Sequence, residues 1–523
     1  MNSRYRMHQI KLNMNETKSD IPKKILKKLN NRDLILTDLE IVKESLDARD
    51  KGDIKFVYTV DFQAVTRQRP KQYVNLPMNP KLGLEEAPDM NYLDVESGGE
   101  ELSDQPVIVG FGPCGMFAGL ILAKRGYRPI IIERGRPIEQ RVEDVEKFWS
   151  EGILNTESNV QFGEGGAGTF SDGKLTTGIK DPRIRKVLEE FVRAGADEDI
   201  LYKQKPHIGT DVLRKVVRNI REEILRCGGE IRFDTRFVEV NTKKKCVKSI
   251  VVECAGERYE IPTQNVILAV GHSARDTFRY LCERGIKMQQ KPFSIGVRIE
   301  HPQKLIDKSQ YGNTEGLPPA DYKLNYHCGN GRGVYTFCMC PGGEVITASS
   351  QEGGVVTNGM SNRARNSGKA NSGLLVDVRC EDFGSPHPLA GIEFQEKYEK
   401  LAFENGGGTY EAPKTTWGEF RSEALSAAPV IRSLPEFAVA AIREAMPHLG
   451  RKLSGFDRDD AVMTAVETRS SSPVRFARNE EMEGTFGGFY PAGEGTGYAG
   501  GIMSAACDGI KVAEKIIGKY KPF

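Results

Sequence analysis

The chain has 523 residues, which is too many for a single hydrophobic core, so two or three domains are expected. A net charge of only +2 gives no sign of a nucleic-acid-binding protein, and the apolar runs are much shorter than the roughly 18 residues of a membrane-spanning helix. Residues 1–20 lack the apolar centre of a secretory signal, and the ten cysteines include no C-x-x-C pair. These features predict a cytoplasmic protein with reduced thiols and no metal site.

The first 80 residues are expected to form a separate small α/β module. Residues 21–29 predict a lysine-rich amphipathic helix that begins after Ser19 and Asp20, and residues 53–62 alternate as a strand does. A ferredoxin-like arrangement, or a similar small sheet with helices on one face, fits this pattern. The module has 16 basic and 10 acidic residues. We interpret its lysine stripe as a solvated helix face, with an RNA or partner surface as the alternative.

Residues 81–104 are rich in Pro, Gly and acidic groups, which predicts a linker. Residues 105–285 then alternate between buried strands, glycine turns and helices, as the first part of a Rossmann-type cofactor domain does. Residues 286–460 lack this alternation and contain a loop-rich stretch at 353–372, so we predict an inserted α+β substrate or cap domain. Residues 461–523 return to the nucleotide-binding pattern and complete the cofactor domain.

A dinucleotide fingerprint opens the cofactor domain. A buried strand at 107–109 leads into Gly110-Phe-Gly-Pro-Cys-Gly115, then into a helix at 116–125 and a strand ending at Glu133. In such a turn Gly110 allows the tight bend, Gly112 lets the backbone approach a pyrophosphate, and Gly115 lets the helix pack against the strand. Glu133, 18 residues beyond Gly115, is suited to accept hydrogen bonds from an adenosine ribose. This pattern suits FAD and NAD equally.

A second glycine-bearing motif lies near the end of the chain. Residues 489–495 predict a short strand that delivers Glu494, and Gly500-Gly501 precede a helix at 502–517. Here the chain resembles the glutathione-reductase-like flavoproteins, which place an acid at this point on the FAD ribityl chain. The family's usual Asp is Glu494 in this chain. The resemblance also implies that the helix start lies beneath the flavin, where its partial positive charge stabilises the reduced anion.

The resemblance narrows at four further segments, namely residues 161–174, 206–211, 269–276 and 490–508. Together they are similar to the bacterial family called uncharacterised FAD-dependent, or NAD(FAD)-utilising, dehydrogenases, and the likeness covers nearly the whole chain. It implies FAD as the cofactor and leaves the substrate open. The residues expected to contact FAD are Gly110, Gly112, Pro113, Cys114, Gly115, Glu133, Arg134, Gly165, Gly166, Gly168, Thr169, Lys174, Val238, Gly271, Gly493, Glu494, Gly500, Gly501 and Ile502.

Candidates for catalysis are fewer, and each has a structural alternative. His272 could donate a proton or make a structural hydrogen bond, and Lys174 could stabilise negative charge at the flavin or simply be exposed. Cys340, in the run Cys338-Met-Cys340, could do redox chemistry, but in a strand both thiols would share one face and could simply pack. Polar contacts to a substrate could come from Arg298, His301 and residues 357–361, and residues 469–475 are expected near the flavin cleft.

The leading functional hypothesis is an FAD-dependent oxidoreductase that passes hydride or electrons through the flavin to or from a small molecule. Only one complete dinucleotide fingerprint is present, so NAD(P)H could bind transiently over the flavin rather than in a domain of its own. One alternative is an RNA-associated flavoprotein resembling the tRNA-uridine-modifying flavin proteins, which near-neutral charge disfavours. Another is a flavin-binding protein without turnover. The sequence does not fix the oligomeric state.

Overall fold

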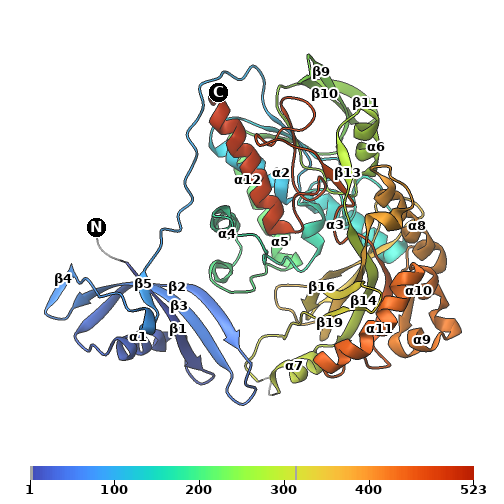
Figure 1. The fold of residues 1–523 in the computed structure, drawn as a ribbon. Coiled ribbons are helices and arrows are strands. Elements are labelled where there is room, and N and C mark those ends of the chain that lie inside the picture. The colour runs from blue at the N-terminus through green and yellow to red at the C-terminus, as the bar shows by residue number, and fades with distance from the viewer. Residues whose placement is uncertain (1–3, 313–314) are drawn as a thin grey trace.

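The computed structural model describes residues 4–312 and 315–523, and Figure 1 shows a small N-terminal module beside a much larger body. An antiparallel sheet in the order β2-β3-β1-β5, with β4 paired to β3, forms the module. Ile21 and Ile25 of α1 are buried in a core of the module's own. Its elements are β1 Tyr5–Asn13, α1 Ile21–Leu29, β2 Leu34–Asp47, β3 Lys55–Thr66, β4 Arg69–Tyr73 and β5 Leu84–Glu86.

The module differs from the expected outline in two ways. It contains a single α-helix within residues 4–86, whereas a ferredoxin-like βαββαβ arrangement has two. Its last strand, β5, pairs with β1, so the module continues past residue 80 and the linker begins later than predicted. The linker then reaches the far end of the molecule, where the Gly98 amide donates to the Ile517 carbonyl at 2.8 Å.

Five short parallel strands in the order β23-β12-β6-β7-β8 form the centre of the cofactor domain. They are β6 Val107–Val109, β7 Ile130–Ile132, β8 Glu230–Arg232, β12 Val266–Leu268 and β23 Phe489–Pro491. From β6 the chain continues to β7 and β8 on one side of the sheet, and it later returns to β12 and β23 on the other side. In open parallel sheets a ligand crevice lies at the carboxyl ends of strands around such a point. The structure therefore has the predicted Rossmann-type α/β fold.

Helices cover this sheet, and the two motif helices lie side by side. The helix α2 (Pro113–Lys124) packs against α12 (Ile502–Lys519), which comes from the other end of the domain. It begins at Pro113 rather than at the expected residue 116, because proline is well suited to a first helical turn. The domain's other elements are α3 Ile138–Glu151, α4 Arg183–Arg193, α5 Thr210–Arg226, β9 Thr235–Lys243, β10 Cys246–Cys254, β11 Glu257–Pro262 and α6 Arg275–Glu283.

The inserted domain is built on a six-stranded sheet in the order β15-β16-β19-β14-β21-β20, beside the β17-β18 hairpin. Its helices α8 to α11 lie on the outer side of this sheet (Figure 1). The strands are β14 Phe293–Pro302, β15 Asn325–His327, β16 Gly333–Pro341, β17 Glu344–Ala348, β18 Val356–Met360, β19 Lys369–Val378, β20 Lys414–Thr416 and β21 Val462–Glu467. The helices are α7 Gln303–Tyr311, α8 Ala390–Asn405, α9 Trp417–Ser422, α10 Ala428–Arg432 and α11 Glu436–Lys452.

Two expectations for the inserted domain need correction. The stretch 353–372 is loop-rich as expected at 353–355 and 361–368, but it also contains β18 and the start of β19, which pairs along its length with β14. The boundary at 460 is too early, because β21 pairs with β14 inside the cap sheet. The chain leaves and re-enters the cofactor domain through a two-stranded ribbon of β13 (Met288–Gln290) and β22 (Val474–Phe476).

Among the described residues, no single helix has the length and apolar character needed to cross a membrane. One helix pair, Leu425–Arg432 with Glu436–Lys452, passes such a test only when both members are combined, and the two are bent by 119°.

Candidate functional site

A cavity of about 730 Å³ lies where the ends of the Rossmann strands face the cap sheet. This volume is in the range of cofactor and ligand sites, roughly 300–1,000 Å³. Most of the residues expected to contact FAD line it, namely Gly110, Gly112, Pro113, Cys114, Glu133, Arg134, Gly166, Gly168, Lys174, Gly271, Glu494, Gly500, Gly501 and Ile502. A second cavity of about 870 Å³ lies around Arg134 and Arg236, is lined mostly by charged side chains and contains none of the glycine turns.

Four glycines leave open space at the cavity wall. A Cβ atom built on Gly112 would come no closer than 3.7 Å to Gly166, and one built on Gly271, Gly500 or Gly501 would meet nothing within 4 Å. They belong to three separate segments, the β6–α2 turn, the end of β12 and the start of α12. The missing side chains therefore create a backbone-lined cradle that the protein itself does not fill.

Other glycines of the two motifs are needed for packing. A Cβ atom on Gly115 would lie 2.0 Å from the Gly110 carbonyl oxygen, and one on Gly493 would lie 2.8 Å from Cys114. Gly115 thus has the predicted helix-packing role. Neither Gly115 nor Gly493 lines the cavity, so the expectation that they contact FAD directly is not matched by the structure.

Glu133 holds the two glycine loops together. One of its carboxylate oxygens accepts the Phe111 amide at 2.8 Å, and the other accepts the amides of Gly135 and Gly163 at 2.9 and 3.0 Å. A carboxylate offers about four lone-pair positions, so one remains for a ribose hydroxyl. Glu133 therefore fits the predicted ribose contact and also has a structural role that the sequence did not suggest.

Arg134, the next residue, is fixed beside the cavity. Its guanidinium lies 4.2 Å from the centre of the Phe162 ring and donates to the carboxylates of Glu157 and Asp276. These two carboxylates raise its pKa, against the effect of burial. Arg134 can present a fixed positive charge to an anionic part of a cofactor.

The glycine-rich loop 163–174 joins the cofactor domain to the cap hairpin. Its buried Asp172 accepts hydrogen bonds from Ser361 and, at 2.8 Å, from Arg365. Lys174 lines the cavity with its amine 3.9 Å from Asp172. Two residues of this loop that were expected to contact FAD, Gly165 and Thr169, do not line the cavity. Gly165 packs against Thr169, so that an added Cβ would clash with it, and Thr169 is buried.

Val238 is a further correction. It lies within β9, where the pairing with β10 shifts register, and it does not line the cavity. Its neighbours Thr235, Arg236 and Phe237 do. The resemblance placed the cofactor contact on the right strand but at the wrong residue, because a strand bulge changes which residues face the ligand.

His272, which is buried, and Glu494, which is partly exposed, form a pair at the cavity wall. The His272 Nδ1 atom lies 2.6 Å from Glu494 Oε1, and the His272 backbone amide donates to Glu494 Oε2 at 3.3 Å. Burial would raise the pKa of Glu494, but the contacts with His272 and the charge of Lys291 lower it. The His272 Nε2 atom has no hydrogen-bond partner among the described residues. The pair therefore leaves one ring nitrogen available to a ligand.

The cap wall carries a buried ion pair that the sequence did not predict. Arg298 and Glu467 are both buried, with Arg298 Nε 2.5 Å from Glu467 Oε2, and Glu467 lines the cavity. Burial raises the pKa of Glu467 to about 7, although Arg298 opposes this shift. A carboxyl group with such a pKa can exchange a proton at neutral pH.

Of the remaining candidate residues in the cap, some line the cavity and one is buried in the interior of the domain. Thr357, Asn358, Arg469 and Ser470 line the cavity, as residues 357–361 and 469–475 were expected to do. His301 does not, because it is buried, its Nε2 atom donates to the Phe456 carbonyl, and its ring stacks on the Phe456 ring. His301 is therefore a packing residue.

The thiol that faces the cavity is Cys338 rather than the predicted Cys340. The pairing of β16 with β19 shifts between Phe337 and Cys340, and Cys338 has a φ of 44°. The two thiols therefore do not share one face, as regular strand alternation would require.

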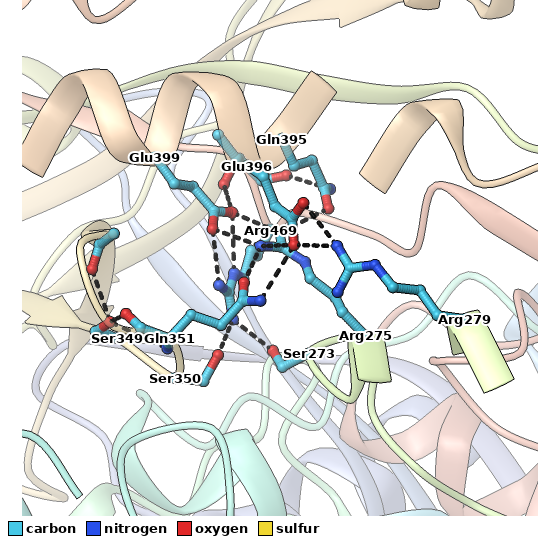
Figure 2. A network of polar contacts seen from close by, with 12 residues as sticks. Ser273, Arg275, Arg279, Ser349, Ser350, Gln351, Gln395, Glu396, Glu399 and Arg469 are labelled. Atoms are coloured by element: carbon cyan, nitrogen blue, oxygen red, sulfur yellow. Dashed lines mark hydrogen bonds and ion pairs between the residues drawn. The ribbon is translucent and has the colours of Figure 1, made fainter. Parts of the chain in front are cut away.

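A buried charge network fastens the cap to the cofactor domain (Figure 2). Glu399 of α8 accepts two hydrogen bonds of 2.8 Å from Arg275 of α6, and Arg469 donates to both of its oxygens at 2.8 and 3.1 Å. Arg469 also donates to Ser273 and Ser350, each at 2.7 Å. Arg275 is 1% exposed and Glu399 is 2% exposed, so the charges that join the two domains are almost fully buried.

The lysine stripe of the N-terminal module is largely engaged within the module. Lys24 lies 2.6 Å from Glu16, Lys23 lies 3.3 Å from Asp20, and Lys28 donates to the His8 carbonyl at 2.9 Å. These local contacts favour the interpretation as a solvated helix face.

Two family profiles match the chain, and each falls on one structural unit. Residues 292–470 match the family "FAD-dependent protein, C-terminal domain-like", and residues 4–63 match a domain of unknown function, DUF8436. The first match coincides with the cap from β14 to the segment after β21, which supports the later boundary seen in the structure. It also confirms the expectation that the chain is an FAD-dependent protein.

Solved structures with a related arrangement are distant. A geranylgeranyl bacteriochlorophyll reductase-like protein from Thermoplasma acidophilum is 13% identical with a TM-score of 0.35, over 80% of this chain and 78% of that one. Glycine oxidase from Bacillus cereus is 11% identical with a TM-score of 0.35, over 80% of this chain and 98% of that one. Likeness at this level identifies no activity.

A much nearer relative is an uncharacterised protein from Clostridium beijerinckii. It is 47% identical over 535 aligned residues, which cover 98% of this chain and 99% of that protein. Identity at this level over the whole length includes the N-terminal module, the cofactor domain and the cap. The chain therefore belongs to the same family as this clostridial protein and carries the C-terminal domain of FAD-dependent proteins.

Proposed function

We propose that the protein is an FAD-dependent oxidoreductase that holds FAD in the cavity between the Rossmann sheet and the cap and acts on a small molecule admitted beside the cap wall. The observation that carries the proposal is the cradle formed by Gly112, Gly271, Gly500 and Gly501. Three segments far apart in the sequence each present bare backbone to one cavity. A cofactor that must touch main chain along much of its length explains this arrangement.

The residues present fit the parts of FAD in a definite order. The start of α2 at Gly112 and Pro113 suits the pyrophosphate, because the first amides of a helix are unpaired and its dipole favours anions. Glu133 has acceptor capacity for the adenosine ribose. The start of α12 at Gly501 and Ile502 suits the flavin ring, as the resemblance to glutathione-reductase-like flavoproteins implies. When bound there, FAD supplies two-electron transfer.

The chain's own residues would orient the substrate and handle protons. His272, held at Nδ1 by Glu494, lines the cavity and can hold a proton at its Nε2 atom, which has no partner among the described residues. Glu467 can hold a second one on the cap side. Phe337, Met339 and Val356 of the cap wall exclude water from the space between these groups.

Anaerobic mixing of FAD-loaded protein with NADH and NADPH tests the proposal. Because the fold has one dinucleotide site, we expect the nicotinamide to bind transiently and to bleach the visible absorbance of the flavin within the time of turnover. The rate should depend on pH in the wild type, and that dependence should change in Glu467→Gln. Flavin that stays oxidised with both nicotinamides and with every small-molecule donor tested would instead favour a flavin-binding protein without turnover.

A further inference from the structure

Two cysteines of the cap stand together at the wall of the cofactor cavity. Cys338 lines the cavity, whereas Cys340 is 0% exposed and lies directly behind it. The Cys340 thiol donates to the Cys338 carbonyl oxygen at 3.3 Å, and each of the two thiols shifts the pKa of the other. No other pair of cysteines among the described residues has such a contact, and the remaining cysteines are separate free thiols.

The backbone around the pair departs from a regular strand. The ladder between β16 and β19 shifts register between Phe337 and Cys340, and Cys338 adopts the left-handed region with φ of 44°. A non-glycine residue in this region is uncommon, and such backbone conformations gather at functional sites. In a regular strand, alternate thiols stand side by side and point the same way. The bulge instead turns Cys338 to the cavity and leaves Cys340 within reach behind it.

The charges around the pair favour one thiolate and one thiol. Arg298 donates to the Cys338 carbonyl at 2.9 Å, and Lys174 lines the same cavity as Cys338. The hydrogen bond from Cys340 lowers the pKa of Cys338 well below its usual range, with help from Lys174 and Arg298 and against the effect of burial. The same hydrogen bond and burial raise the pKa of Cys340. A thiolate beside a protonated partner is the arrangement that thiol–disulfide chemistry uses.

We propose that Cys338 and Cys340 are a redox-active thiol pair that exchanges two electrons with FAD bound in the same cavity. This inference rests on the proposed function, because it needs the flavin as electron partner. On oxidation the Cys338 thiolate and the Cys340 thiol form one S–S bond, and the Cys340 S–H bond breaks. Two electrons and one proton leave the pair and pass to oxidised flavin, and the reverse reaction regenerates the thiolate and the thiol. Glu467, which also faces Cys338, is placed to relay the proton.

The test combines an electron count with a thiol count on the same sample. FAD-loaded wild-type protein is titrated anaerobically with dithionite, quenched at each step with acid and N-ethylmaleimide, and digested with trypsin. Both cysteines fall in one tryptic peptide, Gly333–Arg363, which contains no other cysteine. Its mass therefore reports directly whether the pair is bridged or doubly alkylated.

We expect wild-type protein to take up two more electrons per bound flavin than the flavin alone requires. Over that range the Gly333–Arg363 peptide should change from bridged and unlabelled to doubly labelled. Cys338→Ser and Cys340→Ser should lose the extra two electrons and keep their FAD. Cys328→Ser is the matched control, because this cap cysteine donates to the Ala441 carbonyl, does not line the cavity and should leave the electron count unchanged.

The inference is overturned if the wild-type peptide is doubly labelled at every stage while the flavin is reduced with only its own two electrons. That result needs no variant, so a destabilising effect of Cys340→Ser cannot obscure it. Protein that retains no FAD would contradict the proposed function as well. Bound, reducible flavin beside unreactive thiols would contradict this inference alone.

Discussion

At the scale of single residues, the most informative positions are the glycines that line the cavity, because they have no side chain. Gly112 has an ordinary backbone conformation and room for a methyl group in the free protein, because its closest neighbour would lie 3.7 Å away. Gly112→Ala should therefore fold normally, yet its methyl group would occupy the space in which a pyrophosphate must approach the backbone. We expect FAD affinity to fall by at least about tenfold, or about 1.4 kcal/mol, with an unchanged Tm. Calorimetric titration and thermal melting measure the two effects.

Two further alanine variants serve as controls for this prediction. Gly115→Ala should lower the Tm, because its Cβ would lie 2.0 Å from the Gly110 oxygen. Gly99→Ala, in the linker with open space around it, should change neither Tm nor affinity. If Gly112→Ala bound FAD as tightly as the wild type, the β6–α2 turn would not be the pyrophosphate site.

Glu467 predicts a pH dependence of stability. Its pKa in the folded protein is about 7, above the usual glutamate value of 4.5, so between these values the folded state holds a proton that the unfolded state has released. This contribution makes the fold less stable as pH rises through that window, by up to about 3 kcal/mol. Glu467→Gln should remove the loss. The Tm of Glu467→Gln should therefore rise relative to that of the wild type from pH 5 to pH 8. A difference that stays constant over this range would be evidence against the raised pKa.

At the scale of elements, the network around Glu399 joins α8 to α6 and to the segment after β21. Removal of one member of a buried ion network leaves its partners uncompensated, which typically costs about 3–5 kcal/mol. Glu399→Ala should therefore strongly reduce the free energy of unfolding, because Arg275 and Arg469 both lose the carboxylate that they share, and Arg275 keeps only the more distant carboxylate of Glu396 at 3.8 Å. Glu393→Ala, on the same helix, is the matched control, because Glu393 is exposed and the loss should stay below about 1 kcal/mol.

Acid should weaken the same network. Burial would raise the pKa of Glu399, but Arg275 and Arg469 lower it well below its usual range. A depressed carboxyl pKa contributes stability that is present above the unfolded value and is lost as pH falls below it. The gap in Tm between the wild type and Glu399→Gln should therefore narrow on acidification below about pH 4.5. A gap that stayed the same would show that the charge of Glu399 does not contribute.

Elements with local signals could be predicted from the sequence. The helix at 21–29 was found with its bounds because its apolar period, its polar start and Pro22 all lie within one short segment. The strands β19 and β21 were missed because they pair with β14, which is far along the chain, and β18 was missed because its polar residues acquire strand structure from pairing with its neighbour β17. The orientation of Cys338 was missed because a bulge changes which residues share a face.

At the scale of the whole molecule, the same distinction divides the candidate site. The cofactor side could be predicted, because each of its glycine turns is a contiguous motif. The cap wall could be predicted only in part: residues 357–361 were expected there, but Cys338 and Glu467 come from two different strands that meet only in the folded sheet. The residues next to Glu467 in the sequence do not indicate that it is buried beside Arg298 and the cavity. The cofactor side of the site is thus specified by contiguous sequence motifs, whereas much of the cap side depends on contacts between distant strands.

The N-terminal module is expected to be separable from cofactor binding. It has its own core, none of its residues in the described range 4–86 lines the cavity, and β2 meets the cofactor domain through backbone contacts such as Glu44 N to Tyr202 O at 2.8 Å. A chain that begins at residue 87 should therefore bind FAD with unchanged stoichiometry and with at most a small loss of stability. Gel filtration followed by flavin absorbance measures this, and colourless protein would place the module within the cofactor site.

The central claim is that glycine-bearing turns from both ends of the large domain converge on one FAD molecule. Calorimetric titration of FAD into cofactor-free protein tests it most directly, with wild type, Gly112→Ala and Gly501→Ala compared side by side. The structure predicts one site per chain in the wild type, and weaker binding in both variants at unchanged Tm, although the two glycines belong to helices at opposite ends of the domain. No heat of binding to folded wild-type protein, or loss in only one variant, would contradict it.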